Sequence, residues 1–229
     1  MLAITKSMAL HGLDGYMISV QVDISAGMPY FEIVGLPDTS IRESKERVKT
    51  AIKNSHIEFL SRRIVVNLAP ANTKKEGSSL DLAIAVGILI ASGNVNISPD
   101  SELLKDTIFI GELSLDGSIE KIRGILPICI EAKKLNIKRI ILPKQNAREA
   151  AFVDGIEILP VTNIKEVILY LNGSLNIPIE KSMNFSIKEY NRYDVDFSEV
   201  KGQENVKRAL EVSAAGGHNC LLIRKSWFW

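Results

Sequence analysis

The sequence has little of several features that mark specialised classes of protein. Only two cysteines occur among its 229 residues, Cys129 and Cys220, and both lie in apolar stretches. So few thiols exclude a disulfide framework or a cysteine-rich metal site, and they favour reduced structural thiols in a reducing compartment. Lysine and arginine number 28 against 27 aspartates and glutamates, a net charge of +1. Binding of nucleic acid or of an anionic membrane would therefore depend on a local patch.

Long hydrophobic runs are also missing. The longest, residues 82–91, has about half of the roughly 20 residues that span a bilayer. Residues 1–10 lack the basic-then-apolar pattern of a secretory leader. We therefore expect a cytoplasmic protein without a membrane partner. What the chain does have, 46% hydrophobic and 24% charged residues, is the balance of an ordinary globular protein with one main core.

Hydrophobic periodicity predicts the first elements. Alternation over residues 16–24 is typical of a strand with one buried face, and residues 31–34 look like its hairpin partner. A helix is expected to begin at Ser40, whose hydroxyl would cap it while Glu43 completes a capping box. Residues 63–68 form a further β-branched run, which predicts another strand.

The middle of the chain predicts an α/β fold. A helix at residues 80–91 is apolar nearly all round, so it should be the central buried helix. The dipeptide at 116–117, Asp-Gly, favours a hairpin turn between strands at 107–110 and 118–122. Helices and strands then alternate, with helices at 125–135, 147–152 and 164–171 and strands at 139–142 and 156–160. This alternation predicts α/β layering with a parallel component late in the chain.

A change of composition divides the chain into two domains. Residues 1–172 hold the patterned elements, and residues 173–195 are polar and broken by glycine and proline, which is typical of a linker. Residues 196–229 begin a new unit, in which we expect a helix at 204–215 and a short apolar strand at 220–223.

Several short motifs follow one another in a fixed order. They are VGLPD at 34–38, VNLAP at 66–70, KEG at 75–77, GEL at 111–113, VKGQ at 200–203 and AAGGHN at 214–219. On these motifs the chain resembles the magnesium chelatase-like AAA+ ATPases of the YifB/ComM family, from residue 1 to about residue 223. The resemblance implies an α/β (α+β) protein: a Lon protease/GHMP-kinase-like β-α domain, followed by a fragment of an AAA+ P-loop domain.

The same resemblance implies cofactors and partners. Intact family members bind and hydrolyse ATP with Mg²⁺, act on DNA as hexameric helicases or translocases, and are linked to recombination, competence and natural transformation. DNA and further copies of the chain are thus the implied partners. An incomplete remnant of the family's nucleotide-pocket entrance is formed by Val200, Gly202, Gln203, Gly217, His218 and Asn219.

The KEGSS segment resembles the Lon nucleophile loop and places Ser79 at the nucleophile position. A serine nucleophile of this kind needs a lysine held neutral beside it, and the resemblance places Leu126 where Lon has that lysine. Because leucine cannot accept a proton, the dyad is incomplete and we expect no catalytic residue, although Lys121 could approach from a neighbouring strand. The residues themselves favour a structural role, in which Ser78 and Ser79 cap the buried helix and Asp81 lies in its first turn.

The 229 residues contain no phosphate-binding loop of the form GxxxxGK[ST]. In the family this loop directly follows the strand that residues 220–223 resemble, whereas this chain continues with RKSWFW at 224–229. We therefore expect a chain truncated before the loop, without ATPase activity. Reading the codons of the tail one base later permits Gly-Ser-Pro-Gly-Ser-Gly-Lys, so our hypothesis for the tail is a frameshift within the loop. A genuine short protein is the alternative.

Two groups of side chains each have a plain alternative. Four basic residues would form a rim for DNA or a neighbouring subunit, or else an ordinary solvated surface, which the net charge favours: Arg62, Arg63, Lys74 and Lys75. Three histidines lack metal-ligand spacing and are expected at surface or turn positions: His11, His56 and His218. Two other functions stay open, a stand-alone Lon-like module for interaction or oligomerisation and a serine hydrolase using Ser79.

Overall fold

The computed structural model describes residues 1–98, 101–182 and 195–223, and it divides into two units, Met1–Asn184 and Phe185–Trp229. The first unit is built on a seven-stranded sheet of order β3-β4-β2-β1-β5-β8-β9. The strands are β1 (Leu2–His11), β2 (Asp14–Ser25), β3 (Tyr30–Val34), β4 (Arg63–Ala69), β5 (Thr107–Phe109), β8 (Arg139–Pro143) and β9 (Glu157–Val161). A two-stranded sheet is formed by β6 (Glu112–Leu113) and β7 (Ile119–Glu120).

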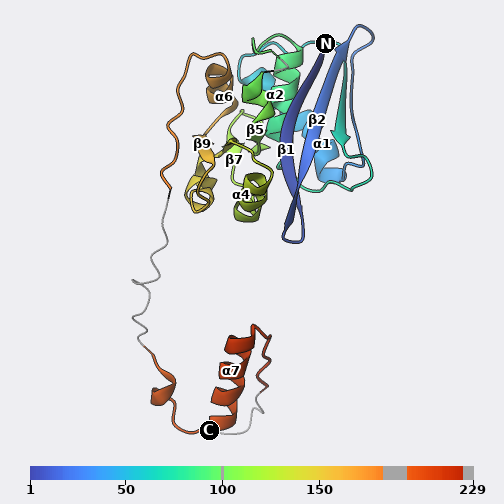
Figure 1. Cartoon of the computed structure of the whole chain (residues 1–229). Helices are drawn as coiled ribbons and strands as arrows, with labels where there is room; N and C mark the ends of the chain where they lie inside the picture. Colours follow the sequence, from blue (N-terminus) through green and yellow to red (C-terminus); the bar gives the residue numbers. More distant parts are fainter. Residues whose placement is uncertain (99–100, 183–194, 224–229) are drawn as a thin grey trace. The chain divides into compact units, whose positions relative to one another are not determined.

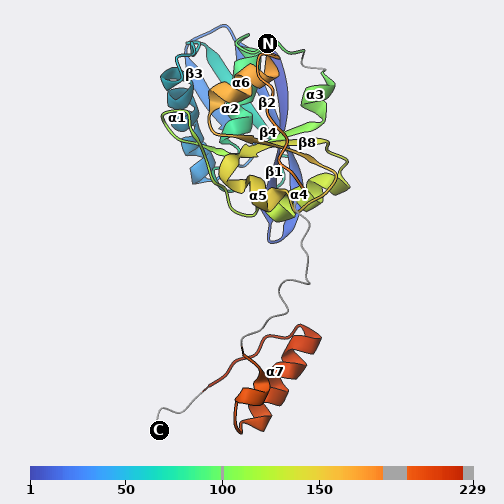
Figure 2. The ribbon, with the colours of Figure 1, turned by 90° about the vertical axis from the view of Figure 1, so that its left-hand side faces the viewer.

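Helices cover both faces of the large sheet (Figures 1 and 2). One face carries α1 (Thr39–Asn54), α2 (Asp81–Ala91), α3 (Glu102–Lys105) and α6 (Ile164–Leu171). The other face carries α4 (Ile125–Lys134) and α5 (Ala147–Ala150), which follows the 3₁₀ turn η1 (Lys144–Asn146). The fold is thus a mixed α/β layer structure, as the alternating pattern predicts.

The first hairpin joins β1 and β2. These strands pair antiparallel along their full length, and β2 also pairs antiparallel with β4. The expected hairpin between residues 16–24 and 31–34 is wrong, because β3 pairs in parallel with β4. The helix α1 connects β3 to β4 and supplies the crossover that parallel neighbours need. The pattern does not predict β1, since its buried face carries small and hydroxyl residues such as Thr5, which donates to the Ala83 carbonyl at 2.9 Å.

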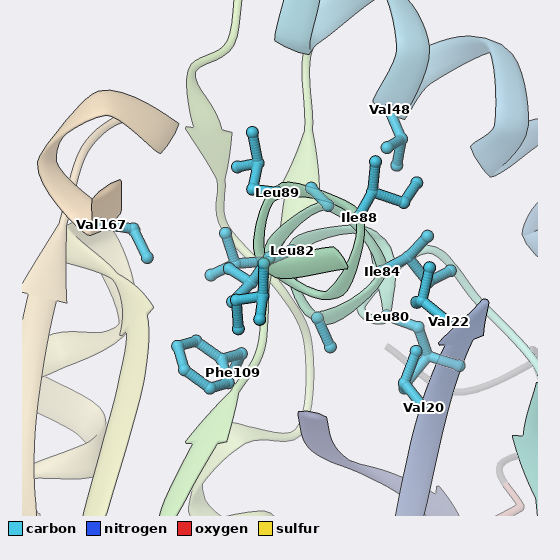
Figure 3. Close-up of a cluster of buried hydrophobic side chains, with 14 of the residues drawn as sticks. Val20, Val22, Val48, Leu80, Leu82, Ile84, Ile88, Leu89, Phe109 and Val167 are labelled. Carbon is cyan, nitrogen blue, oxygen red and sulfur yellow. The ribbon is translucent and has the colours of Figure 1, made fainter. Parts of the chain in front are cut away.

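Helix α2 is the centre of the core. All 11 of its residues are buried, which confirms the central helix expected from its composition. Figure 3 shows it end-on, surrounded by side chains of β2, α1, β5 and α6, among them Val22, Val48, Phe109 and Val167. At Gly87 an added Cβ would lie 2.6 Å from the Val22 side chain. Glycine therefore lets α2 pack directly on β2.

Helix α1 begins one residue after Asp38, which is its N-cap. The Asp38 Oδ1 atom accepts a hydrogen bond from the Ile41 N–H at 2.8 Å. The expectation that Ser40 caps this helix is wrong, because Ser40 already lies within the first turn. Aspartate is at least as strong a cap as serine, and Asp38 has the extended backbone that a cap needs.

The later elements largely follow the sequence pattern. β6 and β7 form the hairpin expected at Asp116-Gly117, and the Asp116 carboxylate accepts from the Ser118 N–H at 2.9 Å. The strand expected on its other side, 107–110, is wrong. Residues 107–109 form β5, which pairs in parallel with β1 and β8, and residues 112–113 pair with β7 instead. The parallel pairs β5–β8 and β8–β9 confirm the late parallel component.

The second unit is described over residues 195–223. It contains a 3₁₀ turn, η3 (Phe197–Glu199), and α7 (Glu204–Gly216), which confirms the helix expected at 204–215. The strand expected at 220–223 is wrong: residues 195–223 form no strand, and a strand needs a neighbour to receive its backbone hydrogen bonds. The tail at 224–229 and linker residues 183–194 lie outside the described residues. Every helix in the described ranges is too short or too polar to cross a bilayer.

Candidate functional site

The loop between β4 and α2, which carries Ser79, is held in place by a buried lysine. Lys75 is fully buried, and its Nζ donates to the carbonyls of Gly35, at 3.0 Å, and Pro70. Burial lowers the pKa of Lys75. Its backbone also pairs with the segment before α1, since the Lys75 N–H donates to the Leu36 carbonyl at 3.2 Å. Both alternatives from the sequence, a basic rim and the favoured solvated surface, are therefore wrong at Lys75, which is buried and fixes the loop.

Asp38 ties the same loop to the start of α1. Its Oδ1 caps α1, and its Oδ2 accepts from the Gly77 N–H at 3.0 Å. Gly77 has φ +88°, a left-handed conformation that glycine adopts at little cost. The approach to Ser79 is thus set by one carboxylate, one buried ammonium group and one glycine.

A cavity of about 360 Å³ opens at the end of this loop, and we call it the serine pocket. Its polar lining consists of Glu76, Gly77, Ser78, Ser79, Glu112, Lys121 and Arg123, over a floor of Ala9, Leu10, Ile122 and Ile128. The Ser78 hydroxyl donates to the Glu112 carboxylate. The Ser79 hydroxyl has no hydrogen-bond partner within the described ranges, and it lies partly exposed in the pocket.

The two serines do not cap α2. The N-cap is Leu80, which makes no side-chain capping bond, and α2 begins at Asp81. Only backbone groups of the serines support the helix start: the Ser78 carbonyl accepts from the Asp81 N–H at 3.2 Å, and the Ser79 carbonyl accepts from the Gly111 N–H at 2.9 Å. The capping expectation is therefore wrong, because the Ser78 hydroxyl is bonded to Glu112 and the Ser79 hydroxyl faces the cavity.

Asp81, behind the pocket, is the centre of a buried polar cluster. Its fully buried carboxylate accepts from Arg47 Nε at 2.7 Å, from the Ser44 hydroxyl and from the Leu113 N–H at 3.2 Å. Burial raises the pKa of Asp81, while the donors from Arg47 and Ser44 oppose that shift. The cluster joins α1, α2 and β6. Sequence reasoning misses it, although a lone carboxylate opening an apolar helix signals a need for a buried partner.

The residues expected from the Lon resemblance are only partly together. Lys121 directly follows β7 and lines the serine pocket with Ser79, as its position permits, but it is exposed. Leu126 lies in the first turn of α4 and lines a different cavity, with Ile130 and Phe152. A lysine acts as a base where burial favours its neutral form. The pocket therefore offers a hydroxyl nucleophile beside an exposed cation, without a buried base.

The expected nucleotide-pocket remnant lies at the two ends of α7. Gln203 is the N-cap residue, with φ +57°, and follows Gly202, with φ +71°. At the other end, Gly217 ends the helix with φ +63°, and the His218 N–H donates to the Ser213 carbonyl at 2.9 Å. These four residues, together with Val200 and Asn219, are exposed. The positive φ angles identify turns that begin and end the helix, and whether these residues touch a nucleotide stays a prediction.

The remaining candidate groups are the histidines and the two cysteines. Within the described residues, no three His, Cys, Asp or Glu side chains come together as a metal site, and the three histidines are exposed. Cys129 is buried, and burial raises its pKa to about 12. Cys220 is exposed, in contrast to the structural thiol expected there.

Comparison with known proteins gives matches to both units. A family model described as subunit ChlI of Mg-chelatase matches residues 20–146, and a second, described as magnesium chelatase, subunit ChlI, matches residues 196–226. The competence protein ComM of Haemophilus influenzae is 36% identical over 97% of this chain and 43% of its own length. The uncharacterized protein YifB of Escherichia coli is 36% identical over 97% of this chain and 42% of its own length.

A more distant match supports the resemblance of the first unit. A Lon protease of Methanosphaera stadtmanae is 27% identical over 82% of this chain and 23% of its own length. The chain spans less than half the length of these curated relatives. The first family model alone covers more than half of the chain, including the Lys75 loop, α2 and most of the serine pocket. The chain therefore belongs to the magnesium chelatase-like family that includes YifB and ComM.

Proposed function

We propose that this chain supplies the Lon-like domain and the opening helix of the AAA+ module of a DNA-processing ATPase. The observation that carries the proposal is the similarity to the competence protein ComM, 36% identity over 97% of the chain, which extends through both units. DNA uptake and recombination are the processes that the family resemblance implies. The domain boundaries at 172 and 195 are part of the same proposal.

The Lon-like domain is proposed to act without hydrolysing peptides. The Ser79 hydroxyl lies in the serine pocket, but the only lysine lining that pocket, Lys121, is exposed. The buried lysine of the same loop, Lys75, donates to two carbonyls instead. The buried ammonium group of the loop is thus occupied in holding the backbone.

ATP and Mg²⁺ are cofactors of intact family members in this proposal. The 229 residues hold no GxxxxGK[ST] loop, so we propose that they do not hydrolyse ATP by themselves. A fluorescent ATP analogue with Mg²⁺ tests this part of the proposal. We expect no saturable binding by the purified chain, and saturable binding that is lost when Gly217 and His218 are substituted would contradict it.

The DNA role is tested by fluorescence anisotropy with labelled single-stranded, duplex and four-way-junction DNA. We expect the purified chain to bind at least one of these at low salt, with an affinity that falls as salt rises, because phosphate contacts release counterions. Failure to bind any of them, with the chain shown to be folded, would contradict the proposed role in DNA processing.

One observation favours a second candidate, a serine hydrolase. Ser79 and Lys121 line one cavity, and a Lon protease is among the relatives. This candidate requires a peptidase or esterase activity that Ser79→Ala abolishes. A stand-alone interaction or oligomerisation module, the third possibility, requires that the chain self-associate without binding DNA, which size-exclusion chromatography with light scattering would detect.

A further inference from the structure

A second cavity, of about 210 Å³, lies where α1 ends beside the edge strand β3, and we call it the basic pocket. Lys49 and Lys53 of α1 line it together with Arg62, and its aromatic lining is Tyr30, Phe31 and Phe59. The two phenylalanine rings lie 6.3 Å apart between centroids, at an angle of 34°. A pocket of this size is smaller than the roughly 300 Å³ of a typical drug-sized site, so it suits a single ring system.

The cations of the basic pocket are not neutralised within the described residues. None of its lining residues is an aspartate or glutamate, and no ion pair of Lys49, Lys53 or Arg62 is found there. Lys49 and Lys53 are four residues apart on α1, a spacing at which like charges repel. The acidic residues nearest to the lining along the chain, Glu32, Glu46 and Glu58, do not line the pocket. The Glu32 carboxylate accepts from the Tyr30 hydroxyl, and Glu46 and Glu58 are exposed. An anion bound across the pocket would relieve this repulsion.

Aromatic rings beside cations without an acidic partner are typical of proteins that bind single-stranded nucleic acid. Bases stack on aromatic faces, and lysine and arginine contact the phosphates that follow. Phe31 and Phe59 are both only partly buried, and Arg62, like lysine, is a phosphate ligand. Since the whole chain carries a net charge of only +1, this is the kind of local patch on which nucleic-acid binding would depend.

We infer that the basic pocket binds single-stranded nucleic acid, with one base against Phe59 and phosphates on Lys49, Lys53 and Arg62. The inference rests on the proposed role in DNA processing and adds the residues and the form of DNA. The basic residues that the sequence left as either a rim or a solvated surface differ in their surroundings. Arg62 lines the pocket, Lys74 pairs with Glu76 at 2.8 Å and Lys75 is buried.

The test is a salt titration of the full chain binding a fluorescein-labelled dT20 strand, with anisotropy as the readout. Each phosphate contact on a single strand contributes about 0.7 to the slope of log K against log salt. We expect Lys49→Gln/Lys53→Gln to lower the magnitude of that slope by about 1.4. The matched control, Lys144→Gln/Lys165→Gln, removes two other exposed lysines outside the pocket and should leave the slope near that of the unchanged chain.

The stacking part has its own variant, Phe59→Leu, which keeps an apolar side chain. We expect it to weaken binding of dT20 by about fivefold, the low end of base stacking, and to leave binding of duplex DNA nearly unchanged. A thermal melt confirms that each variant is folded. If Phe59→Leu is not folded, the lysine pair still decides the test.

The outcomes separate the inference from the function it rests on. DNA binding with equal slopes for both lysine pairs would overturn the basic pocket as the site while leaving the DNA role intact. Competition by poly-glutamate as effective as dT20 per charge would also overturn it, because it would indicate simple attraction of acidic chains. No binding of any DNA by the folded chain would overturn both.

Discussion

The inward and outward sides of the loop before α2 differ in how their polar groups are used. On the inward side, Lys75 and Asp81 are fully buried and every charged atom has partners in the backbone or in α1. On the outward side, Ser79 shares its cavity with the exposed Lys121, and its hydroxyl has no hydrogen bond to any residue that the structure describes. The difference shows that the buried charged groups hold the backbone of the loop in place. Catalysis by Ser79 would instead need a buried base on the outward side.

The largest effect is expected on the inward side. Asp81→Ala leaves the Arg47 Nε–H and the Leu113 N–H without their acceptor, while Arg47 Nη2 keeps the Ser40 carbonyl at 3.1 Å. Removing one partner of a buried pair costs about 3 to 5 kcal/mol, and we expect about 3 kcal/mol because Arg47 retains some exposure. Urea unfolding measures the change. A loss below about 1 kcal/mol would mean that the cluster does not hold α1 to α2.

A smaller loss is expected for Lys75→Met, which keeps much of the side-chain volume. It leaves the Gly35 and Pro70 carbonyls without their donor, and an unsatisfied buried group costs about 1 to 3 kcal/mol. We expect about 2 kcal/mol in urea unfolding. Lys74→Met, the neighbouring exposed lysine, is the matched control and should change stability by less than about 0.5 kcal/mol.

The contrast extends to a second nucleophile, the Cys129 thiol. Burial raises its pKa from an ordinary value of 9.0 to about 12, so above pH 9 the folded chain keeps a proton that the unfolded chain loses. The free energy of unfolding should therefore be unaffected by this group below pH 9 and fall above it, by up to about 1.4 kcal/mol per pH unit. Comparison with Cys129→Val, which cannot titrate, isolates the effect.

Thiol labelling gives an independent check of the same burial. At pH 8 a disulfide reagent should modify the exposed Cys220 quickly and Cys129 only after unfolding. Equal labelling rates in the native chain would show that the α4 face opens freely and would contradict the assigned burial.

Most of this architecture can be predicted from the sequence, because the spacing of hydrophobic residues indicates which face of a helix or strand is buried. The apolar run of α2, the Asp116-Gly117 hairpin and the late parallel strands all follow from patterns that each element carries in itself. The pairing of β3 with β4 does not, since it depends on the direction of a crossover through α1. β1 is missed because Thr5 and Ser7 are polar yet buried.

The candidate site is only partly readable from the sequence, for a related physical reason. The resemblance identifies Ser79 and Leu126, but not that Lys75 is buried or that Ser78 bonds to Glu112 from a distant hairpin. Contacts between side chains far apart in the chain depend on the tertiary fold, and a charged residue in a polar loop is normally exposed. Lys75 is an exception, because its partners are the backbone carbonyls of Gly35 and Pro70. Every residue has a carbonyl, so the sequence does not indicate which carbonyls will accept from a buried lysine.

The smallest effect is expected on the outward side, and it tests the central claim that the serine pocket places Ser79 beside an exposed lysine and no buried base within the described residues. Ser79→Ala should change the free energy of unfolding by less than about 0.5 kcal/mol, because the hydroxyl has no hydrogen bond to lose within the described residues. The most direct measurement is the release of fluorescent fragments from a labelled unfolded protein by the purified chain and by Ser79→Ala. The account predicts the same background rate for both, and hydrolysis that disappears in Ser79→Ala would contradict it.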